Sequence, residues 1–132
     1  MKPALFRRWR ADARAEETRL EAREITIDVI PASKVLTVAV GGRSTVDSSP
    51  HLRSVLLGLL RQCTSPVVVI DVSALSYLDM SGIATLLEAL KSASEHSVTL
   101  RLAGMSGQVR RLAEIAQLDR IYHAWGSEVE FR

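Results

Sequence analysis

The run "VVVIDV" at residues 67–72 most constrains the fold of this chain. Its residues are apolar at five of six successive positions and most of them are β-branched. This is typical of a central strand in a parallel sheet, which is covered on both faces. A parallel strand needs neighbours that are reached through crossover helices, so the run predicts an α/β fold.

The segments on either side of this run supply such neighbours. Upstream, apolar and polar residues alternate in "ITIDV" and again in "LTVAV", which predicts a hairpin of two strands that turns at Pro31 and ends at Gly41 and Gly42. Ser49 and Pro50 form a favourable helix start. The helix after them carries an apolar stripe of Leu52, Val55, Leu56, Leu59 and Leu60.

Downstream of the run, a second helix is expected to begin near Ser81 and to bury Ile83, Leu86, Leu87 and Leu90. A strand at 98–102 and a helix within "MSGQVRRLAEIAQL" follow, with a last short strand near 121–122 or 129–131. The order β-β-α-β-α-β-α, with that possible final strand, predicts a small mixed sheet of about four to five strands packed against amphipathic helices.

Charge divides the chain of 132 residues into two regions. Residues 1–24 hold seven basic and five acidic side chains, whereas residues 25–132 hold ten of each. We therefore expect a basic, helical or partly disordered extension at 1–24 and one domain at 25–132, without direct nucleic-acid binding. The extension is either a solvated arm or, through Phe6 and Trp9 among basic residues 1–10, a peripheral membrane or partner contact.

Catalytic and metal-binding patterns are missing from the sequence. His51, His96 and His123 lack ligand spacing, and neither GxGxxG nor GxxxxGK[ST] occurs, so no metal or cofactor is predicted. Cys63 is a lone cysteine, and no secretory or membrane-spanning segment is evident, which favours a cytoplasmic protein.

Ser81 lies on a predicted strand-to-helix turn, in "YLDMSG". A nucleophile elbow needs GxSxG, but Asp79 occupies the first glycine position, and its charge opposes an oxyanion; we therefore expect no enzyme. Ser81 is expected to be the N-cap of the helix, and a phosphate on it would meet exposed amides and the positive end of the helix dipole. Such a phosphate would add charge beside Asp79 and repel a partner fitted to the neutral surface.

The segment "VVVIDVSALSYLDMSGIATLLEALKSA" resembles the signature of STAS domains, the family of anti-sigma factor antagonists, and the resemblance continues through "LRLAGMSGQVRRLAEIAQLDRIY". It covers about residues 25–125 and implies a STAS-like fold. It also implies phosphorylation of Ser81 by an anti-sigma factor that is itself a serine kinase. The implied docking surface comprises the loop "GGRSTVDSS" and the start of the second helix, with Val46, Asp47, Asp79, Met80, Ser81 and Gly82 among its contacts.

The resemblance implies an anti-sigma factor antagonist that binds its partner when Ser81 is unphosphorylated and releases it when phosphorylated. Family members often have Ser or Thr where this chain has Met80, and an apolar residue there could suit a more hydrophobic partner. Stand-alone STAS proteins also resemble cytoplasmic subunits of lipid-transport ABC complexes, where the domain would stabilise the ATPase and permease assembly. A scaffold in a larger sensory assembly is a third interpretation.

Overall fold

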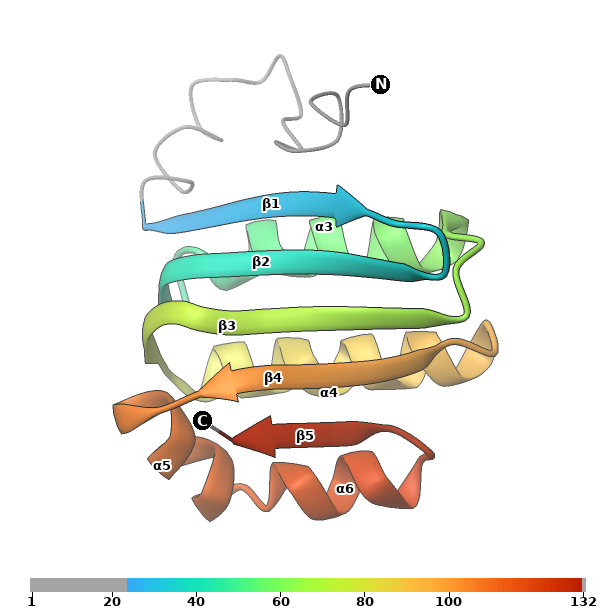
Figure 1. The fold of residues 1–132 in the computed structure, drawn as a ribbon. Coiled ribbons are helices and arrows are strands. Elements are labelled where there is room, and N and C mark those ends of the chain that lie inside the picture. The colour runs from blue at the N-terminus through green and yellow to red at the C-terminus, as the bar shows by residue number, and fades with distance from the viewer. Residues whose placement is uncertain (1–23, 132) are drawn as a thin grey trace.

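The computed structural model describes residues 24–131, which form one five-stranded sheet and four helices (Figure 1). This is the predicted α/β fold. Labels follow Figure 1, and the elements in chain order are β1 (Ile25–Pro31), β2 (Val35–Ser44), α3 (Ser49–Gln62), β3 (Val67–Leu78), α4 (Met80–Glu95), β4 (Thr99–Met105), α5 (Gly107–Ile115), α6 (Leu118–Ala124) and β5 (Glu128–Phe131).

The strands lie side by side in chain order, from β1 at one edge to β5 at the other. β1 runs antiparallel to β2, as the predicted hairpin requires, and the other three pairs are parallel. Each parallel connection therefore passes through a helix. The carboxyl ends of β2 and β3 consequently meet at one end of the sheet, where α3 and α4 begin.

One face of the sheet carries the core. Alternate strand residues point into it, among them Val38, Ile70 and Leu100, each with no exposed surface. α3 and α4 cover this face and lie behind the sheet in Figure 1. α6 packs on the same side, because the buried Tyr122 hydroxyl donates a 2.7 Å hydrogen bond to the carbonyl oxygen of Leu86 in α4.

The opposite face differs from the expectation that β3 is covered on both sides. Within residues 24–131, no helix lies over it (Figure 1). Val67, Val69 and Asp71 of β3 are only half-buried there. We call this surface the open face; its outward strand residues are Thr26, Asp28 and Ile30 of β1, Val35, Thr37 and Ala39 of β2, Val67, Val69 and Asp71 of β3, Thr99, Arg101 and Ala103 of β4, and Glu128 and Glu130 of β5.

Two predicted strand ends are wrong. β2 continues through the glycine pair to Ser44, because Gly41 and Gly42 lie at irregularities of the β2–β3 register rather than in a turn. Gly42 has a φ of +91°, and a Cβ there would clash with the carbonyl oxygen of Glu24. β3 likewise extends beyond the apolar run to Leu78, since its second half pairs with the end of β2.

The end of the chain also differs in part. Residues 121–122, one of the two alternatives for a last strand, lie in α6, and Tyr122 is fully buried there. The other alternative is correct, because β5 spans Glu128–Phe131. α3 begins at Ser49 itself, with Ser48 as its N-cap residue, so Ser49 is one position further into the helix than predicted.

The predictions for the extension fall mainly on residues 1–23, which lie outside the described part of the chain. Within residues 24–131, no helix combines the length and apolar character needed to cross a bilayer. The same residues contain no cluster of three or more His, Cys, Asp or Glu side chains that could hold a metal ion.

Candidate functional site

The site begins where β3 passes into α4, and Asp79 is the residue between them. Its backbone is extended, with φ −114° and ψ −172°. Its Oδ1 accepts hydrogen bonds from the amides of Ser81, at 2.9 Å, and Gly82, at 3.2 Å. Asp79 is therefore the N-cap of α4, and the prediction that Ser81 fills this role is wrong. The carboxylate also places negative charge at the positive end of the helix dipole.

Asp79 also fastens the loop between β2 and α3 to α4. Its second oxygen, Oδ2, accepts a 3.1 Å hydrogen bond from the amide of Val46, and its own amide donates to the carbonyl oxygen of Ser44 at 3.1 Å. The two segments are 33 residues apart in the sequence. One carboxylate thus holds together both segments of the predicted docking surface.

Ser81 lies in the first turn of α4 and is half-buried. Its hydroxyl donates a 2.5 Å hydrogen bond to Asp79 Oδ1. Its oxygen also lies 3.1 Å from the Ser49 hydroxyl oxygen. Ser49 Oγ in turn lies 2.9 Å from Ser44 Oγ, and both of these serines are buried. Because the single Ser81 hydroxyl proton is donated in the hydrogen bond to the carboxylate, the Ser49 hydroxyl can donate to Ser81, and Ser44 to Ser49.

Ser44 and Ser49 lie at positions within the predicted docking loop "GGRSTVDSS", but the sequence does not predict their hydrogen-bonded contact with Ser81. Ser49 and Ser81 are 32 residues apart, and the pairing of β2 with β3 and the packing of α3 against α4 bring them together. The one available signal was the concentration of hydroxyl residues in "RSTVDSS". That pattern is also typical of solvated loops, so it did not identify a buried network.

The loop that precedes α3 has its own hydrogen bonds. Ser48 Oγ accepts from the amide of Thr45 at 2.9 Å and donates to the carbonyl oxygen of Arg43 at 2.7 Å. Thr45 Oγ1 accepts from the amide of Asp47 at 3.1 Å and donates to Glu24 Oε1 at 2.7 Å. Residues 45–48 belong to neither a helix nor a strand, so these side-chain hydrogen bonds take the place of regular backbone pairing. They fix the conformation of the loop that carries Val46 and Asp47.

Gly82 lies buried beneath this loop, where only glycine fits. It is buried, and a Cβ on it would overlap Leu78 Cδ1 and lie 2.7 Å from Ser44 Oγ. The start of α4 can therefore pack against the end of β2 only without a side chain at this position. The structure places Gly82 under the predicted contact surface rather than on it.

Two large apolar side chains project from the site. Val46 in the loop is 68% exposed and Met80 at the start of α4 is 61% exposed. Asp47 is also exposed. Val46 is joined to the first turn of α4 through Asp79, so the described structure offers an apolar and acidic surface around a half-buried serine hydroxyl.

The environment of Asp79 also changes its acidity. Partial burial raises the pKa of its carboxyl, but hydrogen bonds from the Ser81 hydroxyl and from the amides of Gly82, Ser81 and Val46 outweigh this effect and hold the pKa below its ordinary value. Asp79 is therefore a carboxylate at neutral pH. It is suited to orient the Ser81 hydroxyl but is a poor acceptor of its proton.

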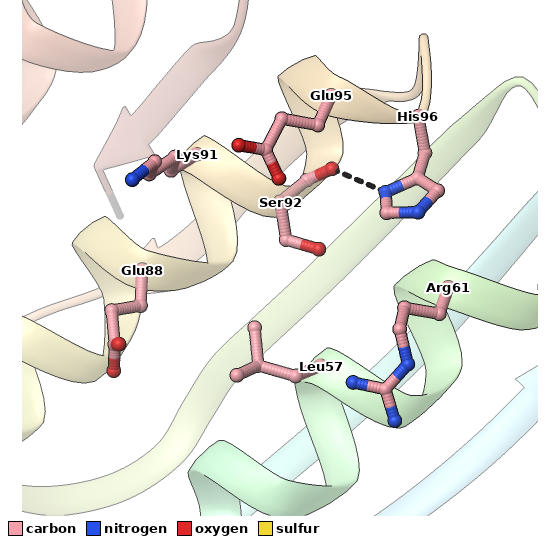
Figure 2. Close-up of a pocket in the computed structure, with 7 residues that line it drawn as sticks. All are labelled: Leu57, Arg61, Glu88, Lys91, Ser92, Glu95 and His96. Carbon is pink, nitrogen blue, oxygen red and sulfur yellow. Dashed lines mark hydrogen bonds between the residues drawn. The ribbon is translucent and has the colours of Figure 1, made fainter.

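A shallow pocket of about 260 Å³ lies between α3 and α4, away from Ser81 (Figure 2). Figure 2 shows side chains from both helices around it, with a hydrogen bond between His96 Nδ1 and the Ser92 carbonyl oxygen, 2.8 Å long. Its lining residues are Leu57, Arg61, Glu88, Lys91, Ser92, Glu95 and His96. None of them belongs to the site described above, and their charges are mixed in sign.

Comparison with known proteins identifies the family. The family model described as the STAS domain matches residues 25–130. The chain belongs to the STAS domain family. The match runs from the first residue of β1 into β5 and includes the four helices of the described structure, so the resemblance predicted from the central segment is confirmed.

Relatives of this STAS domain include proteins named as anti-sigma factor antagonists. The anti-sigma-B factor antagonist of Staphylococcus aureus (strain NCTC 8325) is 30% identical over 107 residues, which cover 80% of this chain and 98% of that protein. Among solved structures, an anti-sigma factor antagonist from Mycobacterium paratuberculosis has a TM-score of 0.67 and 23% identity, over 74% of this chain and 81% of that one.

The fold is also that of SpoIIAA, an anti-sigma factor antagonist. Its unphosphorylated form has a TM-score of 0.64 and 14% identity, over 79% of this STAS domain chain and 87% of that one. A structure of SpoIIAA in the phosphorylated form is known as well, with a TM-score of 0.59 and 13% identity over 79% and 90% of the two chains. At these identities the likeness concerns the fold.

Proposed function

We propose that this chain is a non-catalytic anti-sigma factor antagonist that acts in the cytoplasm by partner switching. Unphosphorylated, it binds an anti-sigma factor that is also a serine kinase; phosphorylated on Ser81, it releases that partner. The observation that carries the proposal is the 2.5 Å hydrogen bond between the Ser81 hydroxyl and Asp79 Oδ1. It puts the modifiable oxygen against a carboxylate that also fixes the docking loop.

The same geometry supports a switch that spares the fold. Asp79, not Ser81, caps α4, so a phosphate on Ser81 leaves the capping hydrogen bonds to the helix amides available. Phosphorylation nevertheless removes the hydrogen bond that the Ser81 hydroxyl donates to Asp79 and adds a group of about −1.5 to −2 charge in its place. Repulsion between this group and Asp79 alters the surface around Val46 and Met80 without removing core contacts.

The name of the staphylococcal relative and the phosphorylated form of SpoIIAA support the proposal by analogy. On this basis the docking surface comprises Val46, Asp47, Met80 and Ser81, with Asp79 and Gly82 holding it in shape. Val46 and Asp47 come from the loop, and Met80 and Ser81 come from α4. An anti-sigma factor that fits this surface needs an apolar patch for the two large exposed side chains.

The direct test is phosphorylation of the purified chain by a candidate anti-sigma factor kinase with ATP, followed by mass spectrometry. Wild type should gain one phosphate, Ser81→Ala none. Ser49→Ala is the matched control, because it removes the hydroxyl 3.1 Å from Ser81 Oγ and should leave the phosphate in place. Phosphate that persists in Ser81→Ala, or that never appears in wild type, contradicts the proposal.

A second candidate is the STAS subunit of a lipid-transport ABC complex. The exposed Val46 and Met80 favour it, because a permanent partner commonly covers apolar surface. Pull-down from the native host separates the two functions. Recovery of an ATPase with a permease supports the transporter subunit, and recovery of a kinase-like anti-sigma factor supports the antagonist.

A further inference from the structure

Within residues 24–131, the second half of β3 lacks a strand neighbour on one side. β4 pairs with β3 only from Val67 to Asp71, whereas β2 accompanies β3 as far as Leu78. Beyond Ala103, the partner of Asp71, β4 leaves β3 and the chain enters α5 near the same end of the sheet (Figure 1). The backbone N–H and C=O groups that the end of β3 directs toward this side therefore need other partners.

Gln108 of α5 supplies these partners for Leu78. Its Oε1 accepts a 2.9 Å hydrogen bond from the Leu78 amide, and its Nε2 donates a 2.7 Å hydrogen bond to the Leu78 carbonyl oxygen. One side-chain amide thus satisfies both backbone groups, as a residue of a neighbouring strand does in an antiparallel hydrogen-bonded pair. The two residues are 30 positions apart, and α5 packs beside β3 with Val109 and Ala113 buried.

The Leu78 carbonyl belongs to the peptide that leads into Asp79. The N–H of this peptide is the amide of Asp79, which donates to the carbonyl oxygen of Ser44 at 3.1 Å. Because the peptide is trans and planar, its C=O and N–H point in opposite directions. One of them is bound by α5 and the other by β2, so the peptide plane is fixed at both ends.

The orientation of this peptide determines where the Asp79 carboxylate lies. The carboxylate accepts hydrogen bonds from the Ser81 hydroxyl at 2.5 Å and from the Val46 amide at 3.1 Å. Both bonds weaken steeply with distance and angle, so a rotation of the plane disturbs the contacts of Asp79 with helix and loop. Gln108 itself is half-buried on α5 and acts on the site through Asp79.

We propose that Gln108 is a positioning residue of the Ser81 site. Its side-chain amide holds the peptide between Leu78 and Asp79, and through it the carboxylate that orients the Ser81 hydroxyl and fastens the docking loop. α5 is then the third segment that shapes the docking surface, beside the loop and α4. The consequence for phosphorylation rests on the function proposed above, whereas the consequence for the geometry of the site does not.

The first test needs no partner. Gln108→Met keeps the length of the side chain and removes both of its hydrogen bonds. In proton–nitrogen NMR spectra of the full chain, we expect the amide signals of Val46 and Ser81, which donate to Asp79, to shift upfield. Their hydrogen exchange should accelerate several-fold relative to the core strands. Gln108→Glu keeps an acceptor for the Leu78 amide but has no donor for its carbonyl oxygen at neutral pH, so it should shift the same signals in the same direction.

Two controls separate positioning from stability. Val109→Ala removes core contacts of α5 but leaves the Gln108 amide in place, so it should lower the melting temperature while the Val46 and Ser81 signals keep their wild-type positions. Gln62→Met, the same substitution at the exposed far end of α3, should change neither. The proposal is overturned if Gln108→Met leaves both signals in place, or if Val109→Ala shifts them as strongly.

The second test uses a candidate anti-sigma factor kinase with ATP. Gln108→Met should slow the phosphorylation of Ser81 several-fold in single turnover, and Gln62→Met should not, because a misplaced hydroxyl reacts more slowly. Equal rates in wild type and both variants overturn the positioning role. If wild type itself gains no phosphate, the partner-switching function fails, and the NMR shifts alone decide the role of Gln108.

Discussion

The Ser81 hydroxyl and Asp79 Oδ1 are 2.5 Å apart, so the residue proposed for modification and the cap of α4 form one hydrogen-bonded unit. The same Oδ1 accepts hydrogen bonds from the amides of Ser81 and Gly82, while Oδ2 accepts a hydrogen bond from the amide of Val46. A change at Ser81 therefore acts on the carboxylate that joins helix and loop. Fold stability and partner binding can be separated experimentally at these two residues.

Removing the cap should destabilise the domain more than removing the hydroxyl. We expect Asp79→Ala to lower the free energy of unfolding by about 1 to 2 kcal/mol, since the loss of an N-cap acceptor costs about this much. Ser81→Ala should cost less, because the amides keep their acceptor. Asp79→Asn should also cost less than Asp79→Ala, because Asn is a comparable cap, and its remaining cost at neutral pH should come from the lost charge. Urea unfolding measures all three; equal losses in Ser81→Ala and Asp79→Ala would contradict the assignment of the cap.

The lowered pKa of Asp79 predicts a specific dependence on pH. A carboxyl whose pKa is lower in the folded than in the unfolded state stabilises the fold above its unfolded pKa, ordinarily 3.8, and this stabilisation is lost as pH falls through the folded value. The difference in unfolding free energy between wild type and Asp79→Asn should therefore shrink on acidification below about pH 4. Titration of unfolding from pH 6 downward checks this, and a constant difference would refute it.

Gly82→Ala should destabilise the domain although alanine favours helices. Helix propensity alone predicts a gain of up to about 1 kcal/mol. The added Cβ, however, would overlap Leu78 and approach Ser44 Oγ to 2.7 Å, and such overpacking costs about 1 to 3 kcal/mol. Ser94→Ala, at an exposed position in the same helix, is the control and should change stability by less than about 0.5 kcal/mol. A stabilised Gly82→Ala protein would show that the loop is loosely packed.

The sequence predicts the strands and helices that have clear periodicity. The apolar runs in β3 and α4 correctly predict a parallel sheet with helical crossovers, and the alternation in β1 and β2 correctly predicts the hairpin. The second half of β3, "SALSYL", lacks such a pattern because its pairing with β2 is irregular. α6 was missed because its seven residues span about two turns, too few for a recognisable stripe.

The site could be predicted by position but not by role. The residues Asp79 to Gly82 were found, yet Ser81 was assigned as the cap because serine and aspartate have similar preference for that position. Choosing between them requires the backbone angles of both residues. The contacts with Ser44 and Ser49 depend on strand pairing over a long sequence separation, which no local pattern contains.

The buried hydrogen bond of Tyr122 should hold α6 against α4. Tyr122→Phe removes the hydroxyl that donates to the Leu86 carbonyl oxygen and leaves the ring in place. We expect a loss of about 1 kcal/mol in unfolding free energy, the usual net value of such a bond. Calorimetry or urea unfolding measures it. A neutral result would indicate that α6 stays in place through apolar packing alone.

Partner binding should depend on the apolar side chains beside Ser81. Met80→Lys and Val46→Asp each place a charge on an exposed position, so neither should change stability by more than about 0.5 kcal/mol. If both side chains are covered in the complex, each variant should weaken binding of the anti-sigma factor more than about tenfold, as expected for residues central to an interface. Ile115→Lys is the matched control, because Ile115 is 78% exposed on α5 and lies outside the site. Titration calorimetry with the same partner compares the three. Weakening by Ile115→Lys instead of by Met80→Lys would place the docking surface on α5.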